Sequence, residues 1–334
     1  MKKRDKWLIY IGLSLLCLAF SIIFAIIIGS VAIPLKTIIS ILVGDYSGLE
    51  SIIILDVRIP RVILGLAIGG ALSTAGVILQ SMFRNPLVEP YTLGISGGAA
   101  LGVAVCVIFK SRGILAGISL PFAGFAGALS VIIPLYLINI RRGLLKMDGI
   151  LLTGVMISFI ASSLVMFILA ISRTEELHGI VFWIMGSLEE PEWMLIAIAL
   201  FISLFCLLLA YLFSNHMNAF TLGEEEAINL GIDVEKTKRF LFFIAALLTG
   251  TSVAVAGIIG FVGLVVPHFV RLFAGGDHRI VLLLSYIIGA SFLIACDTLA
   301  RTIISPIELP VGVITGILGG SLFIYALSRN MNRR

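Results

Sequence analysis

Histidines and cysteines are the residues of this chain that could ligate a metal ion or serve as base or nucleophile. The four histidines are His178, His216, His268 and His278. No two of them have the three- or four-residue spacing that places a pair of ligands on one helix face. The four cysteines are Cys17, Cys106, Cys206 and Cys296. Each lies singly in an apolar run, where a thiol behaves as a small hydrophobe. The sequence therefore predicts no metal site, no cofactor and no catalytic centre.

A phosphate-binding loop is also missing. No Walker A pattern occurs, and the chain contains no Gly-Lys dipeptide, so it lacks the loop that would cradle the phosphates of ATP. If ATP drives this protein, a separate subunit must bind it.

Ionisable residues are scarce in the apolar segments. Asp297 is the only acidic residue well inside a predicted crossing, and Arg301 follows it at the four-residue spacing of a helical ion pair. Proton and sodium relays usually need buried carboxylates. An ion-coupled transporter is therefore disfavoured, and a membrane enzyme, which would need clustered catalytic groups, is disfavoured further.

The longest polar stretch, residues 214–238, contains an acidic run that is typical of a helix start. Thr221 and Glu224 have the spacing of a capping box, and the glutamates suit the positive end of a helix dipole. Gly231 is a natural helix stop. We predict a short helix over 222–230, although a solvated connector would carry the same charge pattern.

Three arginines lie at predicted helix ends on the opposite face. Arg58 and Arg61 flank Ile59-Pro60, and Arg301 ends another apolar run. A single arginine in such a place often only snorkels toward lipid headgroups. Three on a face with few other cations indicate a docking surface, where exposed ion pairs set register and encounter rate more than affinity.

The elements that position these residues are membrane helices. Of the 334 residues 60% are apolar and 13% charged, about half the charged fraction of a soluble domain. Hydropathy and helix breakers predict ten crossings, and the third and eighth are short and glycine-interrupted, so they should lie inside the bundle. The ten crossings are 7–30, 62–83, 91–109, 114–138, 149–171, 193–213, 239–257, 259–274, 279–299 and 310–327.

The basic residues orient these crossings. With both termini in the cytoplasm, 16 of the 23 lysines and arginines fall in cytoplasmic segments, as the positive-inside rule requires. This excess includes Arg141, Arg142 and Lys146 in one loop and Lys236, Lys238 and Arg239 in another.

Glycines recur at the four-residue spacing of one helix face, which permits close backbone approach. The series are Gly65 and Gly69, then Gly94, Gly98 and Gly102, then Gly312, Gly316 and Gly320. The segment Ala75-Gly76-Val77-Ile78 is weakly similar to Ala256-Gly257-Ile258-Ile259. This similarity suggests that crossings two to five and seven to ten form an inverted repeat.

Six segments, in this order, resemble the FecCD-type permeases of ABC importers for iron-siderophores, haem and cobalamin. They are Arg58-Ile59-Pro60-Arg61; Phe83-Arg84-Asn85-Pro86-Leu87 continuing to Glu89-Pro90-Tyr91 and Leu93-Gly94; Leu222-Gly223-Glu224-Glu225 to Gly231; Gly260-Phe261-Val262-Gly263-Leu264-Val265-Val266-Pro267-His268 to Arg271; Asp297-Thr298-Leu299-Ala300-Arg301; and Glu308-Leu309-Pro310-Val311-Gly312. One departure is Gly319-Gly320-Ser321-Leu322-Phe323, where many members have Gly-Ala-Pro-Phe-Phe.

The resemblance implies one ten-helix permease domain over 1–334, in the cytoplasmic membrane of a prokaryote. It implies a second copy or paralogue, with the pathway along 149–171, 174–187 and 310–327. Arg58, Arg61 and Arg301 match positions that meet an extracytoplasmic binding protein. The helix over 222–230 matches the element that enters a cleft of the ATPase subunit, and its expected coupling residues are Leu222, Gly223, Glu224, Glu225, Glu226, Ala227, Leu230 and Gly231.

The expected function is import of ferric-siderophore-type chelates, with haem or cobalamin as the alternative cargo. The missing proline near Gly320 leaves open how much of the last helix lines the pathway. Apart from its subunits the expected partner is the lipid bilayer, and no nucleic acid is expected.

Overall fold

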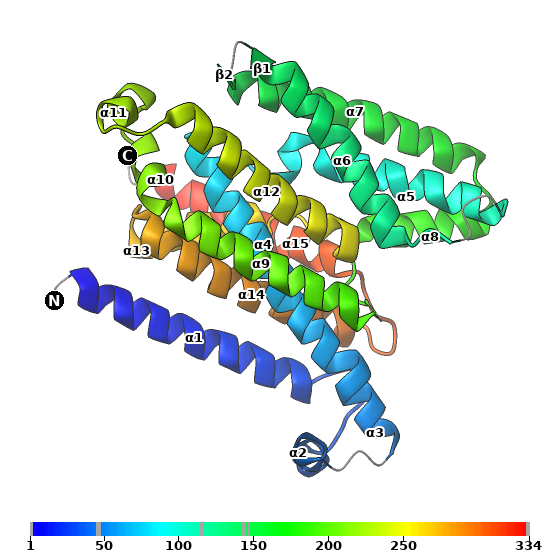
Figure 1. Cartoon of the computed structure of the whole chain (residues 1–334). Helices are drawn as coiled ribbons and strands as arrows, with labels where there is room; N and C mark the ends of the chain where they lie inside the picture. Colours follow the sequence, from blue (N-terminus) through cyan, green and yellow to red (C-terminus); the bar gives the residue numbers. More distant parts are fainter. Residues whose placement is uncertain are drawn as a thin grey trace.

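A computed structural model describes the chain except for residues 1–2, 45–47, 114–116, 142–143, 146, 191 and 332–334. The described part is a bundle of roughly parallel and antiparallel helices (Figure 1). Among the residues described, seven helices are long and apolar enough to cross a membrane, and three more are shorter but apolar. Each of the ten predicted crossings coincides with one of these helices, so the predicted all-helical membrane fold is confirmed.

The helices that correspond to the ten crossings are α1 (Lys3–Ile27), α4 (Ile59–Met82), α5 (Ile95–Ser111), α6 (Leu120–Asn139), α7 (Met147–Ile171), α9 (Trp193–Leu212), α12 (Val234–Ala256), α13 (Val262–Ala274), α14 (His278–Thr302) and α15 (Val311–Met331). The first turn of α1 and the last turn of α15 lie at the same end of the bundle (Figure 1). Two loop helices, α10 (Ser214–Phe220) and α11 (Glu224–Asn229), lie at this end too.

Several connecting elements were not predicted from hydropathy. The second crossing begins earlier than expected, because α3 (Leu49–Ile52) and the π-helical segment η1 (Ile53–Arg58) run directly into α4. The helices α2 (Leu35–Val43) and α10 and a small hairpin of β1 (Ile140–Arg141) and β2 (Leu144–Leu145) are also additions. In contrast, α8 (Thr174–Met185) matches the short helix that the resemblance placed after the fifth crossing.

Helix α4 is the centre of the bundle, buried along nearly all of its length. It packs against α14, α9, α12 and α13. Gly69 of α4 faces the backbone of Gly289 on α14 so closely that a Cβ would overlap it. Gly98 and Gly102 of α5 face Gly127 and Ala123 of α6 in the same way. These two predicted glycine seams are therefore real contacts between backbones.

The packing follows the predicted inverted repeat. If α4 to α7 correspond to α12 to α15, the contact of α4 with α14 should be mirrored by one of α12 with α6, and it is. The contacts of α5 with α6 and α7 are likewise mirrored by those of α13 with α14 and α15. Both α5 and α13 follow a segment that is not regular α-helix. Before α5 this is the 3-10 turn η2 (Pro90–Leu93), and before α13 it is the segment 257–261.

These two non-helical segments contact each other. A carboxylate oxygen of Glu89 accepts a hydrogen bond from the backbone N–H of Phe261 at 2.6 Å, and the hydroxyl of Tyr91 accepts one from Ile259 at 3.1 Å. Phe261 has a left-handed backbone (φ 68°). Irregular backbone within a membrane bundle needs such partners, because lipid offers none. Glu89 is thus an acidic residue with an interior role that hydropathy did not reveal.

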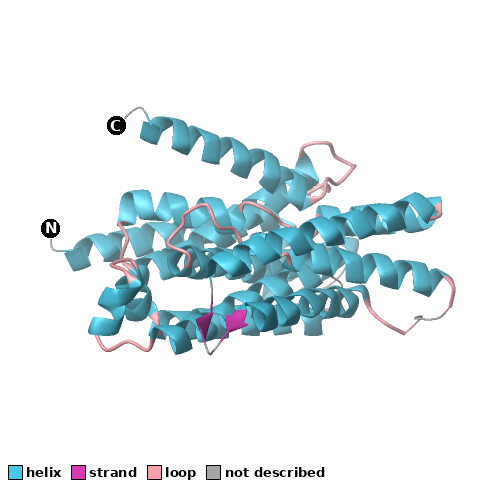
Figure 2. Ribbon diagram, turned by 90° about the horizontal axis from the view of Figure 1, so that it is seen from above, coloured by secondary structure: helices cyan, strands magenta, loops and turns pink. Residues whose placement is uncertain are grey.

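The outer helices leave apolar side chains uncovered. Most of α1 and α7 is exposed in the single chain, and the far half of α15 stands apart from the bundle (Figure 2). No atom of another element lies within 4 Å of a Cβ built on Gly316 of α15. The third glycine series is therefore in contact with the rest of this chain over only part of its length. Gly312 does face backbone, at Ile258 and at Met185 of α8.

Candidate functional site

The three arginines expected to form a docking surface have buried side chains. Their relative exposures are 2% for Arg58, 5% for Arg61 and 3% for Arg301. The three guanidinium groups are therefore not exposed in the single chain. Each guanidinium is folded inward because carbonyl or carboxylate oxygens of the same chain surround it. The docking role itself stays a prediction.

Arg58 and Arg301 hold the end of α1. The guanidinium of Arg58 donates to the carbonyls of Ile26 at 2.6 Å and Ile27 at 3.0 Å, and also to Val31. These carbonyls belong to the last turn of α1 and the loop after it, where no intrahelical donor is available. Arg301 reaches the carbonyl of Ala25 at 3.4 Å. The arginines replace the N–H groups that the helix end lacks.

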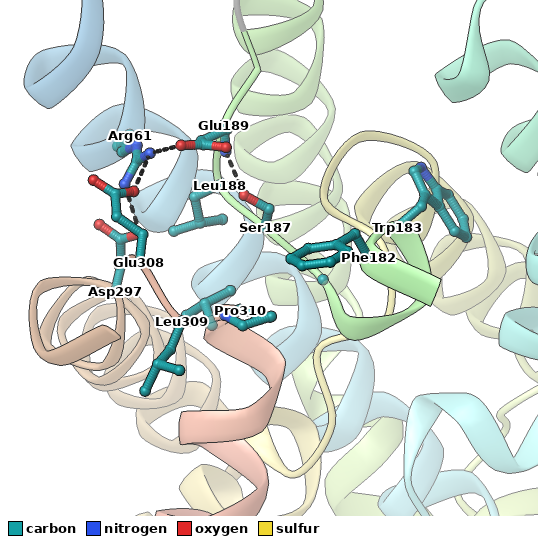
Figure 3. Close-up of a pocket in the computed structure, with 12 residues that line it drawn as sticks. Arg61, Phe182, Trp183, Ser187, Leu188, Glu189, Asp297, Glu308, Leu309 and Pro310 are labelled. Carbon is teal, nitrogen blue, oxygen red and sulfur yellow. Dashed lines mark hydrogen bonds and ion pairs between the residues drawn. The ribbon is translucent and has the colours of Figure 1, made fainter. Parts of the chain in front are cut away.

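Arg61 lies at the centre of a charged cluster (Figure 3). Its guanidinium pairs with Glu189 and with Glu308 at 2.7 Å, and Asp297 lies 4.0 Å away. Asp297 in turn pairs with Arg301 at 2.9 Å, as the four-residue spacing predicted. Glu189 is the most accessible member, with 61% of its side chain exposed, whereas Glu308 is 33% exposed.

The cluster connects the segment that follows α8 with the segment that precedes α15. Glu189 follows α8, and Glu308 precedes α15. Between these segments lies a cavity of about 290 Å³, and Arg61 and Asp297 also line it. Phe182 and Trp183 of α8 close its other side (Figure 3). Glu189 and Glu308 were not predicted as site residues, because only the fold brings them to Arg61.

At the opposite end of the bundle, α11 corresponds to the short helix predicted over 222–230 but begins two residues later than expected. Gly223, with φ 131°, is the residue before the helix, and Gly231, with φ 82°, ends it by donating to the Ile228 carbonyl at 2.8 Å. The predicted capping box is wrong: the Thr221 hydroxyl donates to the Asn218 carbonyl at 2.6 Å. The reason is that Thr221 lies at the end of α10, an extra helix in this loop.

One face of α11 packs inward and the other is open. Ala227 is fully buried, whereas Leu222, Ile228 and Leu230 are each 60% or more exposed. Glu225 and Glu226 are exposed beside them. Exposed apolar side chains grouped at a water-facing end indicate a protein contact. Ile228 was not among the expected coupling residues, although it belongs to this group.

Lys238 connects α11 to α12, and Asp233 caps the start of α12. The Nζ of Lys238 lies 2.7 Å from the carboxylate of Glu224. Asp233 caps α12 by accepting from the backbone N–H of Lys236 at 3.1 Å. Contacts with the Lys236 side chain first, and with its backbone, hold the pKa of Asp233 below its usual value. Asp233 therefore remains ionised and keeps its capping role.

No group of three or more potential metal ligands occurs among the residues that the structure describes. The scattered histidines are not brought together: His178 stacks on Phe182, and His268 lies edge-on to Phe323.

Comparisons with known proteins agree with this arrangement. The model of the FecCD transport family matches residues 17–329. The chain is 38% identical over 282 residues to the hemin transport system permease protein HmuU of Yersinia pestis, covering 84% of each chain. It is also 38% identical over 278 residues to the cobalamin import system permease protein BtuC of Halobacterium salinarum, covering 83% of this chain and 73% of the relative.

A solved structure shares the fold over nearly the full length. It is described as an inward-facing conformation of a metal-chelate type ABC transporter. The TM-score is 0.84 at 28% identity, with 96% of this chain and 98% of the other covered.

Proposed function

Because the chain belongs to the FecCD transport family, we propose that it is the permease subunit of a binding-protein-dependent importer for ferric-siderophore-type chelates. It is a multi-pass membrane protein and an ABC importer permease of the FecCD type. The chelate, the companion subunits and the orientation are parts of the proposal.

The exposed apolar side of α11 is the observation that carries the proposed ATPase contact. Leu222, Ile228 and Leu230 have no cover in the single chain, and the sequence contains no phosphate loop of its own. A separate ATPase subunit that receives α11 in a cleft would bury these side chains and supply the energy. ATP binding drives transport only if it favours one conformation of the bundle over another.

This contact would place α10, α11, the start of α1 and the end of α15 in the cytoplasm, with the Arg61 cluster outside. The charge distribution supports that orientation, since Lys236, Lys238 and Arg239 begin α12 at the α11 end. Arg142 and Lys146, which also entered the positive-inside argument, lie outside the described residues.

The Arg61 cluster is the proposed docking place of the extracytoplasmic binding protein. Acidic side chains of that partner would compete with Glu189 and Glu308 for the guanidinium. A second copy or a paralogue would cover the open side of α15 and the exposed face of α7. The translocation pathway would then lie between the two copies, along α7, α8 and α15.

The experiment is reconstitution. The permease would be placed in proteoliposomes with its ATPase subunit, and uptake of a ferric siderophore, haem and cobalamin would be compared with the binding protein added outside. Uptake should need ATP, the ATPase subunit and the binding protein together. Uphill transport by the permease alone would refute the mechanism, and haem or cobalamin as sole cargo would correct the substrate.

A further inference from the structure

We propose that a cavity beside α10 binds a phosphate group. The cavity has a volume of about 270 Å³ and lies where the end of α4, the end of α10 and the turn between α13 and α14 meet. Its lining includes Arg84, Thr221 and Arg271. Arg84 and Arg271 come from two separate sequence motifs, and neither takes part in the docking and coupling contacts described above.

The two arginines bring positive charge to a cavity that has no carboxylate in its lining. Among the residues that the structure describes, no ion pair involves Arg84 or Arg271. The acidic residues that follow the two arginines most closely along the chain have other partners. Asp277, after Arg271, is held by Arg279 through contacts of 2.7 and 3.0 Å, and Glu89, after Arg84, accepts from the backbone N–H of Phe261. For Arg271, which is partly buried, the lack of a counter-ion is unfavourable, because the guanidinium has lost water and gained no opposite charge.

Arg271 has donors to spare. One of its nitrogens donates to the side-chain oxygen of Gln80, and a guanidinium carries about five N–H groups. The neutral hydroxyls in the lining already have partners: Ser81 donates to the Met217 carbonyl and Thr221 to the Asn218 carbonyl. The Gln80 amide in the lining donates to the carbonyls of Val88 and Gly263, and Nδ1 of His278 contacts the side-chain oxygen of Asn218. The arginines supply the cationic donors of the cavity.

Arg84 is held at the cavity by an unusual backbone. Its φ of 48° is in the left-handed region, which is unfavourable for a residue with a Cβ. Backbone hydrogen bonds from Arg84 to Ser81 and from Asn85 to Gln80 fix the turn. These two bonds form a Schellman motif, a common way for a helix to end with a left-handed residue, and they fix Arg84 at the end of α4.

A phosphate group fits these donors best. Guanidinium groups bind phosphate oxygens with paired N–H donors, and two of them here meet at one small cavity. The ligand is either free phosphate or the phosphate of an anionic lipid headgroup, since basic pockets between membrane helices at a cytoplasmic face bind such headgroups. Thr221 lies two residues before Gly223, so an occupant would contact the segment that leads into α11.

The test measures binding on the purified full-length chain and does not depend on what the protein transports. Inorganic phosphate would be titrated calorimetrically in neutral detergent, and retention of phosphatidylglycerol against phosphatidylcholine would be counted by native mass spectrometry. The variants are Arg84→Gln and Arg271→Gln. Lys236→Gln is the control, because it removes the same charge from an 82% exposed side chain outside the cavity.

We expect one bound phosphate group per chain and affinity about tenfold or more weaker in Arg84→Gln, with Lys236→Gln unchanged. Binding of inorganic phosphate identifies a soluble ligand, and selective retention of phosphatidylglycerol alone identifies the lipid. Because Arg84 is exposed, its variant should fold even if Arg271→Gln does not. Absence of both kinds of binding, or equal binding in Arg84→Gln, overturns the proposal. If Arg84 is protected from chemical modification only when the ATPase subunit is added, its partner is a carboxylate of that subunit, and the proposal is also overturned.

Discussion

The ammonium group of Lys238 on α12 lies 2.7 Å from the carboxylate of Glu224, the first residue of α11. The lysine side chain is 5% exposed and the glutamate 43%. A second carboxylate, that of Glu235, lies 3.7 Å from the same nitrogen. This ion pair fastens the helix that would contact the ATPase to a helix of the membrane bundle.

Replacing Lys238 with Met should weaken that attachment. Since Glu224 can still reach water, we expect a loss of about 1–2 kcal/mol in stability rather than the roughly 3–5 kcal/mol of a fully buried broken pair. ATP-driven uptake should fall more than ATPase assembly does, because α11 remains but is no longer fixed. Thermal unfolding and uptake in proteoliposomes measure the two effects. Lys236→Met is the control, and equal uptake in both variants would contradict the positioning role.

Neutralising Glu189 should strengthen docking of the binding protein. Glu189→Gln removes the more exposed of the two carboxylates paired with Arg61, so less competition remains for a partner's acidic residue. We expect affinity to rise about two- to tenfold, as for a partly exposed ion pair.

Titration of the reconstituted complex with labelled binding protein measures this change. Glu175→Gln, an exposed glutamate on α8, should leave affinity unchanged. If Arg61→Gln binds the binding protein with the same affinity as the unaltered chain, Arg61 is not a docking residue.

Gly29 should tolerate no side chain, because Arg58 occupies the space. A Cβ built there lies 2.7 Å from a terminal nitrogen of Arg58. Gly29→Ala should displace the guanidinium from the α1 carbonyls and cost about 1–3 kcal/mol. Gly12, inside α1, has no atom of another element within 4 Å of its Cβ position, so Gly12→Ala should be neutral or stabilising by up to about 1 kcal/mol. Unfolding midpoints of the two variants in one detergent decide the matter, and equal midpoints would count against the Arg58 anchor.

Gly76 should be the most sensitive of the tested glycines. Its Cβ would overlap the backbone of Gly263 on α13, where neither backbone can move aside. We expect Gly76→Ala to cost about 3 kcal/mol or more. The matched change Gly250→Ala meets nothing closer than 3.8 Å and should be neutral or stabilising by up to about 1 kcal/mol. Similar yields of folded protein from both variants would contradict the tight α4–α13 contact.

The sequence predicted which segments form helices better than it predicted where those helices begin and end. Long apolar runs reveal a membrane helix because the bilayer demands about 20 such residues. The start of α11 was misplaced because Thr221 has a local capping pattern, yet its hydroxyl bonds within α10. The early start of the second crossing was missed because Asp56 and Arg58 interrupt the apolar run that η1 continues.

Sequence alone determined that this is a many-helix membrane protein without a nucleotide loop, and that Asp297 pairs with Arg301. Those properties depend on composition and on residues within one helical turn. Only the tertiary structure decided that Arg61 meets Glu189 and Glu308, or that Arg84 and Arg271 share a cavity, because these contacts join segments more than 100 residues apart. It also decided that the arginines point inward, since most of the carbonyls and carboxylates that attract them lie in distant parts of the chain.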